Sequence, residues 1–416
     1  MEFNNKEVEN ILEYLIPCLE NSELKLKKIN KSDKKNLDKV FKSLLKDIND
    51  GFDYVQSKID SECLVAKIKT ISDVNHKLGA SRYFTSSIKD YIYENGREFV
   101  VYSCNIHDKK VNIHFMLLSE EDQINIEKYD KYASLMYIWL YICTKYTLKE
   151  CNKTLNIYLY LTPFKKELPD KVNIVLSEEH VNSAYTYACV ENGEMVIFRQ
   201  EEWFKIFIHE SIHSFGFDAV LHNAQDVLNH IKSIFDIKSD YSICDAYTET
   251  LARVINSGIY CYNSLKNKKD TKTFCLYMNF LLNMERLYSM NQLNNILSFM
   301  NMNYTNLYGK TENDKYVRDN FYREKTHVFA YYILTSVLLG NFTDFCLWCN
   351  KDTNFYRFNP LESNKKEFLK LIDDNYKSDE FLKELEFVNK YKSNPKNSEK
   401  FNKAFLNSLR MSMVEY

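Results

Sequence analysis

The stretch EEWFKIFIHESIHSFGFD, Glu201–Asp218, decides how the chain is interpreted. Apolar side chains recur in it at spacings of three and four residues, which predicts a helix with one buried face; they are Phe204, Ile208, Ile212 and Phe215. His209 and His213 are four residues apart on a neighbouring stripe, so both imidazole rings can reach one metal ion. Glu210 lies about 100° round the helix from His209, where it can face a water on that ion without binding the ion itself.

The sequence also indicates where this helix starts and ends. Glu201 and Glu202 lie where the first turn favours negative charge, and Gly216 can end the helix in a left-handed conformation. The order His-Glu-x-x-His on a helix is typical of zinc sites with two histidine ligands and a glutamate base. The alternative is a pair of core histidines that are hydrogen-bonded and bind no metal.

Composition argues against several classes of protein. The 416 residues carry a net charge of -2, and the lysine runs are matched by acidic residues, so we expect no nucleic-acid binding. The N-terminal segment has charges where a signal peptide needs an apolar core, and the apolar runs are too short to span a membrane. Because 11 cysteines are scattered along a long chain, we expect free thiols, no disulfides and a soluble, cytoplasmic protein.

Three regions are predicted along the chain. Residues 1–130 form an α+β region of unknown role, with helices to about residue 60 and a hairpin of EFVVYSCNI and KVNIHFMLL. Residues 131–264 form a catalytic core: a buried helix (YASLMYIWLYICTKY), a strand (TLNIYLYLTPF), a hairpin with Asn192-Gly193 in a type I′ turn, and the histidine helix. Residues 265–416 are mostly helical, and we expect them to complete the active-site cleft.

Two histidines make an incomplete catalytic zinc site, which usually has three protein ligands and one position for water. The segment SICDAYTETLARVINSG has a helical pattern, on which Asp245 and Glu249 share a face at a spacing of four residues. Either carboxylate can bind the ion, while the other holds a ligating histidine by its second ring nitrogen.

HESIH followed by DAYTETLA resembles the gluzincin metallopeptidases, in which a second helix carries a Glu ligand, an acid four residues later and then a small residue. By this resemblance Asp245 is the ligand, Glu249 holds a histidine and Ala252 is the small residue. Asp stands where the family usually has Glu and is about one methylene shorter, so Glu249 remains the alternative ligand.

The resemblance implies two further sets of site residues. Gluzincins commonly have an edge strand that hydrogen-bonds the substrate backbone, and VNSAYT offers Asn182, Ala184 and Tyr185 for this role; an ordinary hairpin strand is the alternative. They also often place a His or Tyr from a later helix over the scissile carbonyl. His327 and Tyr331 in REKTHVFAYYI are candidates, and a core stripe of aromatic residues is the alternative.

The expected fold is therefore α+β and zincin-like, with a twisted, mostly antiparallel sheet, an edge strand, the histidine helix and a second ligand helix. The expected function is a zinc-dependent peptidase acting on a peptide or protein. YLYLTPFKKELP, HVNSAY and EEWFKIFIHE are also similar to predicted metallopeptidases of large (giant) DNA viruses, which implies viral or virion partners and a location in host cytoplasm or virion. The rival prediction is a catalytically inactive zincin-fold virion or scaffold protein with a structural or vestigial metal site.

Overall fold

The computed structural model describes residues 6–20, 29–60, 65–74, 76, 78, 83–172, 174–351, 354–394, 401 and 403–416. The chain divides into two compact units, each described here by itself. One, the sheet unit, consists of Ser43–Lys165, Asn182–Ala219 and Tyr416. The other, the helical unit, consists of Met1–Lys42, Lys166–Val181 and Val220–Glu415. The predicted α+β class is confirmed.

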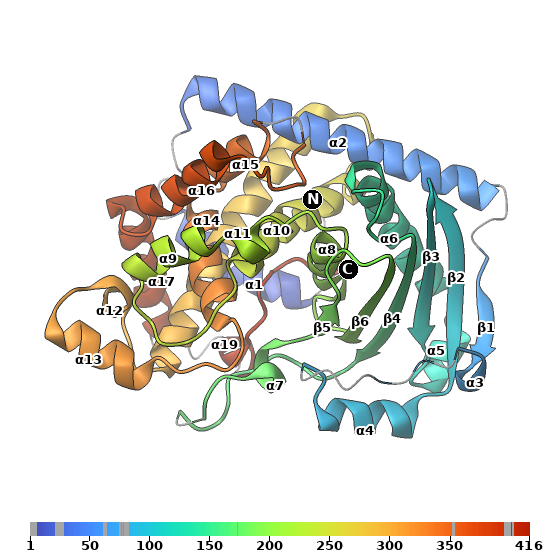
Figure 1. The fold of residues 1–416 in the computed structure, drawn as a ribbon, viewed down its shortest axis with the longest axis horizontal. Coiled ribbons are helices and arrows are strands. Elements are labelled where there is room, and N and C mark those ends of the chain that lie inside the picture. The colour runs from blue at the N-terminus through green and yellow to red at the C-terminus, as the bar shows by residue number, and fades with distance from the viewer. Residues whose placement is uncertain are drawn as a thin grey trace. The chain divides into compact units, whose positions relative to one another are not determined.

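The sheet unit contains a six-stranded mixed sheet in the order β1-β2-β3-β4-β6-β5 (Figure 1). Its strands are β1 (Lys67–Thr70), β2 (Glu98–Ile106), β3 (Lys109–Met116), β4 (Thr154–Thr162), β5 (Ala184–Thr186) and β6 (Asn192–Arg199). β4 pairs in parallel with both β3 and β6, and the remaining neighbours are antiparallel. The parallel centre of this sheet was not expected from the sequence.

One of the two predicted hairpins has a different turn. β2 and β3 form the first hairpin as predicted, with His107 in its turn at φ 50°. β5 and β6 are also antiparallel neighbours, but Asn192 and Gly193 lie inside β6, where Gly193 pairs with Leu155 of β4. The predicted type I′ turn is therefore wrong. Gly193 is required because a Cβ there would lie 2.0 Å from Oδ1 of Asn152.

Helices cover both faces of the sheet. α4 (Ser86–Asn95) buries Ile88 and Ile92 against one face, in a cluster that includes Phe99, Tyr160 and Phe198. α6 (Glu127–Tyr146) covers the opposite face: the rings of Phe115 and Tyr129 have centroids 5.0 Å apart, and the Tyr102 hydroxyl donates to Asp130 at 2.6 Å. α8 (Trp203–Ser214) packs beside α6 and against β5 and β6. Short helices α3 (Ile71–Val74) and α5 (Glu120–Ile124) complete the unit, and α2 (Lys31–Asp60) contributes residues to both units.

The helical unit is built round two long buried helices, α10 (Ile243–Asn263) and α11 (Thr271–Phe299). α10 contains the helix predicted in SICDAYTETLARVINSG, and α11 lies in the region 265–416 that is predicted to be mostly helical. The other elements are α1 (Lys6–Glu20), α7 (Glu178–Val181), η1 (Leu221–Asn223), α9 (Gln225–Ile234), α12 (Tyr304–Tyr308), α13 (Glu312–Phe321), η2 (Phe329–Leu334), α14 (Thr335–Gly340), α15 (Phe342–Cys349), α16 (Glu362–Asn375), α17 (Asp379–Ser393) and α19 (Lys403–Asn407). The buried Glu285 carboxylate of α11 accepts hydrogen bonds from Ser412 and from the backbone of Met413.

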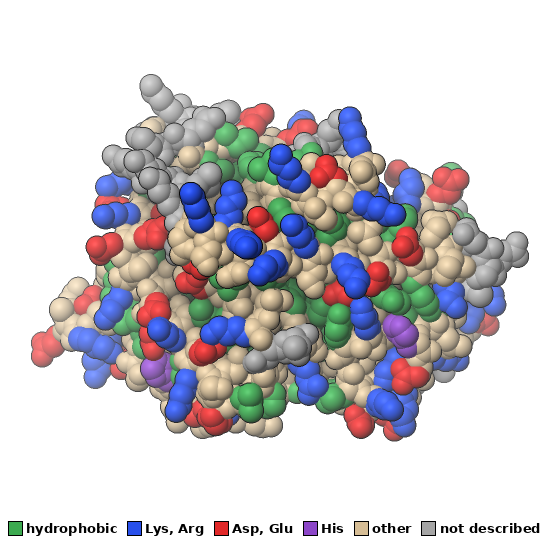
Figure 2. All heavy atoms as spheres, turned by 90° about the horizontal axis from the view of Figure 1, so that it is seen from above, with side chains coloured by type: hydrophobic (Ala, Val, Ile, Leu, Met, Phe, Trp, Pro, Cys, Tyr) green, Lys and Arg blue, Asp and Glu red, His purple; other side chains and the backbone are tan. Residues whose placement is uncertain are grey.

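Two properties of the described residues bear on possible partners. No single described helix is long and apolar enough to cross a membrane; one pair, Phe329–Gly340 with Phe342–Cys349, passes on length and composition but is bent by 89°. On the face in Figure 2, side chains of both charge signs are spread among one another.

Candidate metal centre

α8 carries the two histidines, and residues next to it in the sequence determine where it begins and ends. It begins at Trp203, so Glu201 and Glu202 lie just before the first turn rather than in it, and Glu202 has a left-handed φ of 58°. At the other end Gly216 has a φ of +68°. Its N–H donates to His213 O, and the next N–H, of Phe217, donates to Ile212 O, each at 2.9 Å. This pair of bonds is the Schellman ending that the glycine predicts.

His209 and His213 turn their rings toward one point. Their Nε2 atoms are 3.1 Å apart, and the rings are nearly perpendicular, with centroids 4.8 Å apart. Two nitrogen ligands of one tetrahedral zinc ion are separated by about 3.3 Å, given Zn–N bonds of roughly 2.0–2.1 Å. The two rings therefore fit a shared zinc ion.

Asp218 holds His213 by its other ring nitrogen. Its Oδ2 lies 2.6 Å from Nδ1 of His213, and the Asp218 side chain is fully buried. Because a carboxylate accepts, Nδ1 carries the proton and the Nε2 lone pair is left to face His209. The sequence pattern assigns this role to Asp245 or Glu249. Asp218 was missed because it lies beyond the Gly216 turn, outside the helical pattern.

Glu210 follows His209 on α8 and is partly exposed, whereas His209 is buried. Its side chain therefore leaves the helix in a different direction from the two rings, as the helical spacing predicts. The Glu210 carboxylate is therefore partly accessible to water, next in sequence to one of the two potential ligands.

The predicted acidic residues lie on α10, in the helical unit. Asp245 and Glu249 are both buried, with 7% and 1% of their surface exposed. Glu249 Oε1 lies 2.9 Å from Nε of Arg253, which is fully buried. One carboxylate oxygen of Glu249 thus forms an ion pair with the Arg253 guanidinium on the same helix. Ala252 is buried on the same helix.

The predicted substrate strand lies at one end of the sheet. β5 contains Ala184 and Tyr185 and has β6 as its strand neighbour among the described residues. Asn182 precedes it, and its carbonyl accepts from Nε of Arg199 at 2.9 Å. All three predicted side chains are buried. The sheet unit thus contains both the histidine pair and an edge strand, and α8 packs against that strand.

His327 and Tyr331 lie beside the start of α10. The Ser242 backbone N–H donates to Nδ1 of His327 at 3.0 Å, and Ser242 is the residue preceding α10. In a neutral ring the proton is then on Nε2, which becomes a donor. The two aromatic rings are 6.4 Å apart, but His327 precedes the helix that was predicted to contain it, and Tyr331 lies in the π-helical segment η2.

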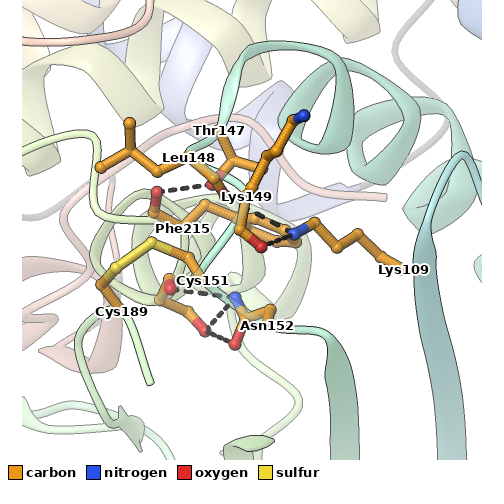
Figure 3. Close-up of a disulfide and its surroundings, with 9 residues drawn as sticks. Lys109, Thr147, Leu148, Lys149, Cys151, Asn152, Cys189 and Phe215 are labelled. Atoms are coloured by element: carbon orange, nitrogen blue, oxygen red, sulfur yellow. Dashed lines mark hydrogen bonds between the residues drawn. A yellow bond between two sulfur atoms is a disulfide. The ribbon is translucent and has the colours of Figure 1, made fainter. Parts of the chain in front are cut away.

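A disulfide was not expected, yet Cys151 and Cys189 of the sheet unit are bonded (Figure 3). The expectation was wrong because it used only the number and scatter of the cysteines. It could not foresee that the loop before β4 and the loop after β5 meet. The other eight described cysteines are buried and lie outside any described disulfide.

Comparison with known proteins adds no relative: no family model, curated protein or solved structure matches the chain.

Proposed function

We propose that the protein is a zinc-dependent peptidase with His209 and His213 as two of the metal ligands. The observation that carries this proposal is the pair of Nε2 atoms 3.1 Å apart, with the tautomer of one ring set by the buried Asp218. A pair of core histidines that binds no metal does not need a buried carboxylate that fixes the tautomer of one ring. Zinc, when bound, would polarise a substrate carbonyl and lower the pKa of a water toward 7.

We further propose Asp245 as the third ligand and Glu249 as an alternative. Glu249 is engaged by the buried Arg253 at 2.9 Å, and breaking such a buried pair is costly. Asp245 stands in the ligand position by the gluzincin resemblance. This choice keeps the Glu249–Arg253 ion pair as a support within α10.

The remaining residues have roles in proton transfer and substrate binding. Glu210 would take a proton from the attacking water and pass it to the leaving amine. His327, with Nε2 as a donor, would hydrogen-bond the carbonyl oxygen as charge develops, and Tyr331 is a second candidate for this role. The edge strand at Asn182, Ala184 and Tyr185 would bind a peptide as an added strand, which fits a peptidase of the zincin type.

The partly exposed Glu210 favours the peptidase over the rival scaffold protein. A purely structural zinc needs its ligands, but it does not need a water-accessible carboxylate that follows one of them on the helix. Viral origin and virion partners remain expectations from the resemblance alone.

The first prediction concerns Glu210→Gln, assayed on a mixture of peptides by mass spectrometry. Loss of the general base should reduce cleavage by about 10²–10⁴-fold while zinc content is unchanged. The matched control is Glu191→Gln, an exposed glutamate paired with Lys153, which should keep wild-type activity. Cleavage that survives in Glu210→Gln would show that the assigned base is wrong.

A further inference from the structure

The single described disulfide lies against the end of the histidine helix. Cys151 precedes β4, and Cys189 lies in the loop between β5 and β6, 38 residues later. The Cys189 N–H donates to the carbonyl of Ser214, the last residue of α8, at 3.1 Å. Next to Cys151, Asn152 donates from Nδ2 to the same carbonyl at 2.9 Å. Both cross-linked segments are therefore hydrogen-bonded to Ser214, the residue that follows His213.

The disulfide also packs on the turn after α8. A Cβ on Gly216 would lie 3.1 Å from Cys189 Cβ and 3.4 Å from both sulfur atoms. Gly216 is in the left-handed region at φ +68°, and two residues later Asp218 holds His213. The path from Gly216 to Asp218 thus fixes the carboxylate that orients the His213 ring.

Cys189 itself is held in an unfavourable backbone conformation. Its φ is 46°, and Asn152 beside the other half of the bond has a φ of 52°. A non-glycine residue in the left-handed region is sterically unfavourable and persists only where its surroundings hold it. The disulfide is one of the restraints on Cys189. After reduction the two sulfur atoms must move apart, which removes this restraint on Cys189 beside Gly216.

We propose that the Cys151–Cys189 disulfide is a redox-sensitive positioning element for the metal ligand His213. In the bonded form it holds the Ser214–Asp218 turn, so that Asp218 presents His213 to zinc. A dithiol supplies two electrons and two protons: the S–S bond breaks, two protein thiols form, and the dithiol becomes a cyclic disulfide. The freed loop then relaxes and the zinc affinity falls. This inference rests on the proposed zinc site and adds redox control to it.

The test measures zinc affinity of the full-length protein by competition with a chromogenic chelator. Protein is compared as oxidised, after dithiothreitol treatment with oxygen-free removal of the reagent, and after reoxidation, with circular dichroism to follow the fold. We expect reduction to weaken zinc binding by about tenfold or more, reoxidation to restore it, and the fold to remain. Cys151→Ser/Cys189→Ser should match the reduced protein and be unaffected by dithiothreitol.

The pathway through Asp218 is tested separately. If the disulfide acts by placing Asp218, reduction should change the zinc affinity of Asp218→Asn by much less than that of the wild type. Equal affinity of the oxidised and reduced wild type, loss of the fold on reduction, or absence of the bond in the oxidised protein would overturn the inference. Failure of the proposed function gives a different result: the oxidised wild type would bind no zinc, or its zinc binding would not depend on His209.

Discussion

At the scale of single residues, His213 uses its two ring nitrogens for different purposes. Nδ1 donates to the buried Asp218 at 2.6 Å, and Nε2 faces His209 at 3.1 Å. Asp218 therefore selects the tautomer of His213 whose Nε2 lone pair is able to bind a metal ion. The resulting prediction concerns affinity for metal rather than proton transfer.

Asp218→Asn should weaken zinc binding by about 10–100-fold and leave the secondary structure intact. The amide can still accept a hydrogen bond from Nδ1, but it lacks the negative charge that makes the imidazole a stronger ligand. Chelator competition measures the affinity, and Asp226→Asn on the exposed surface of α9 is the control. Wild-type affinity in Asp218→Asn would show that this carboxylate does not support the site.

Residues at regular spacing could be predicted, and those brought together by turns could not. His209 and His213 were predicted to face one point because a helix fixes their relative position. Asp218 follows a left-handed glycine, and Cys151 and Cys189 are joined only once two loops meet. No local period encodes those contacts.

At the scale of elements, the start of η2 is hydrogen-bonded to one partly buried acid, Glu324. Both carboxylate oxygens of Glu324 accept from the backbone N–H of Phe329, and Oε1 also accepts from the Tyr322 hydroxyl. Burial raises the pKa of Glu324 from 4.5 to about 8, although these hydrogen bonds oppose the shift. The folded protein therefore keeps a proton on Glu324 at pH values where the unfolded chain has lost it.

This shift predicts how stability changes with pH. Between about pH 5 and pH 8 the folded state binds more protons than the unfolded state at Glu324, so its contribution to the free energy of unfolding falls as pH rises, by up to about 1.4 kcal/mol per pH unit. Glu324→Gln should flatten this part of the curve, measured by urea unfolding at several pH values. The exposed Glu312→Gln should keep the wild-type slope, and an unchanged slope in Glu324→Gln would contradict the assignment.

The elements themselves were predicted well where one period continued. α6, α8 and the β2–β3 hairpin follow clear apolar patterns. The Asn192-Gly193 turn was wrong because a residue pair favourable for a turn served another need: Gly193 lets β6 pass close to Asn152. The close approach to Asn152, which requires glycine at position 193, outweighs the preference of Asn-Gly for a turn.

At the scale of the whole molecule, the chain passes from one unit to the other and returns. The sheet unit takes Ser43–Lys165 and Asn182–Ala219, and the helical unit takes the segments on either side. α8 and α10 are close in sequence but belong to different units. The periodicity of single segments predicts each helix and strand, yet it contains no information on which distant strands pair. The mixed order β1-β2-β3-β4-β6-β5 therefore could not be predicted.

The central claim is that the two histidines of α8 bind zinc. The most direct measurement is the metal content of the purified, full-length protein by mass spectrometry, without added zinc, for the wild type and for His209→Ala/His213→Ala. We predict close to one zinc per chain in the wild type and nearly none in the variant, with matching circular dichroism spectra. A wild type without bound zinc that also takes up none at defined stoichiometry, or a variant that keeps its zinc, would contradict the account.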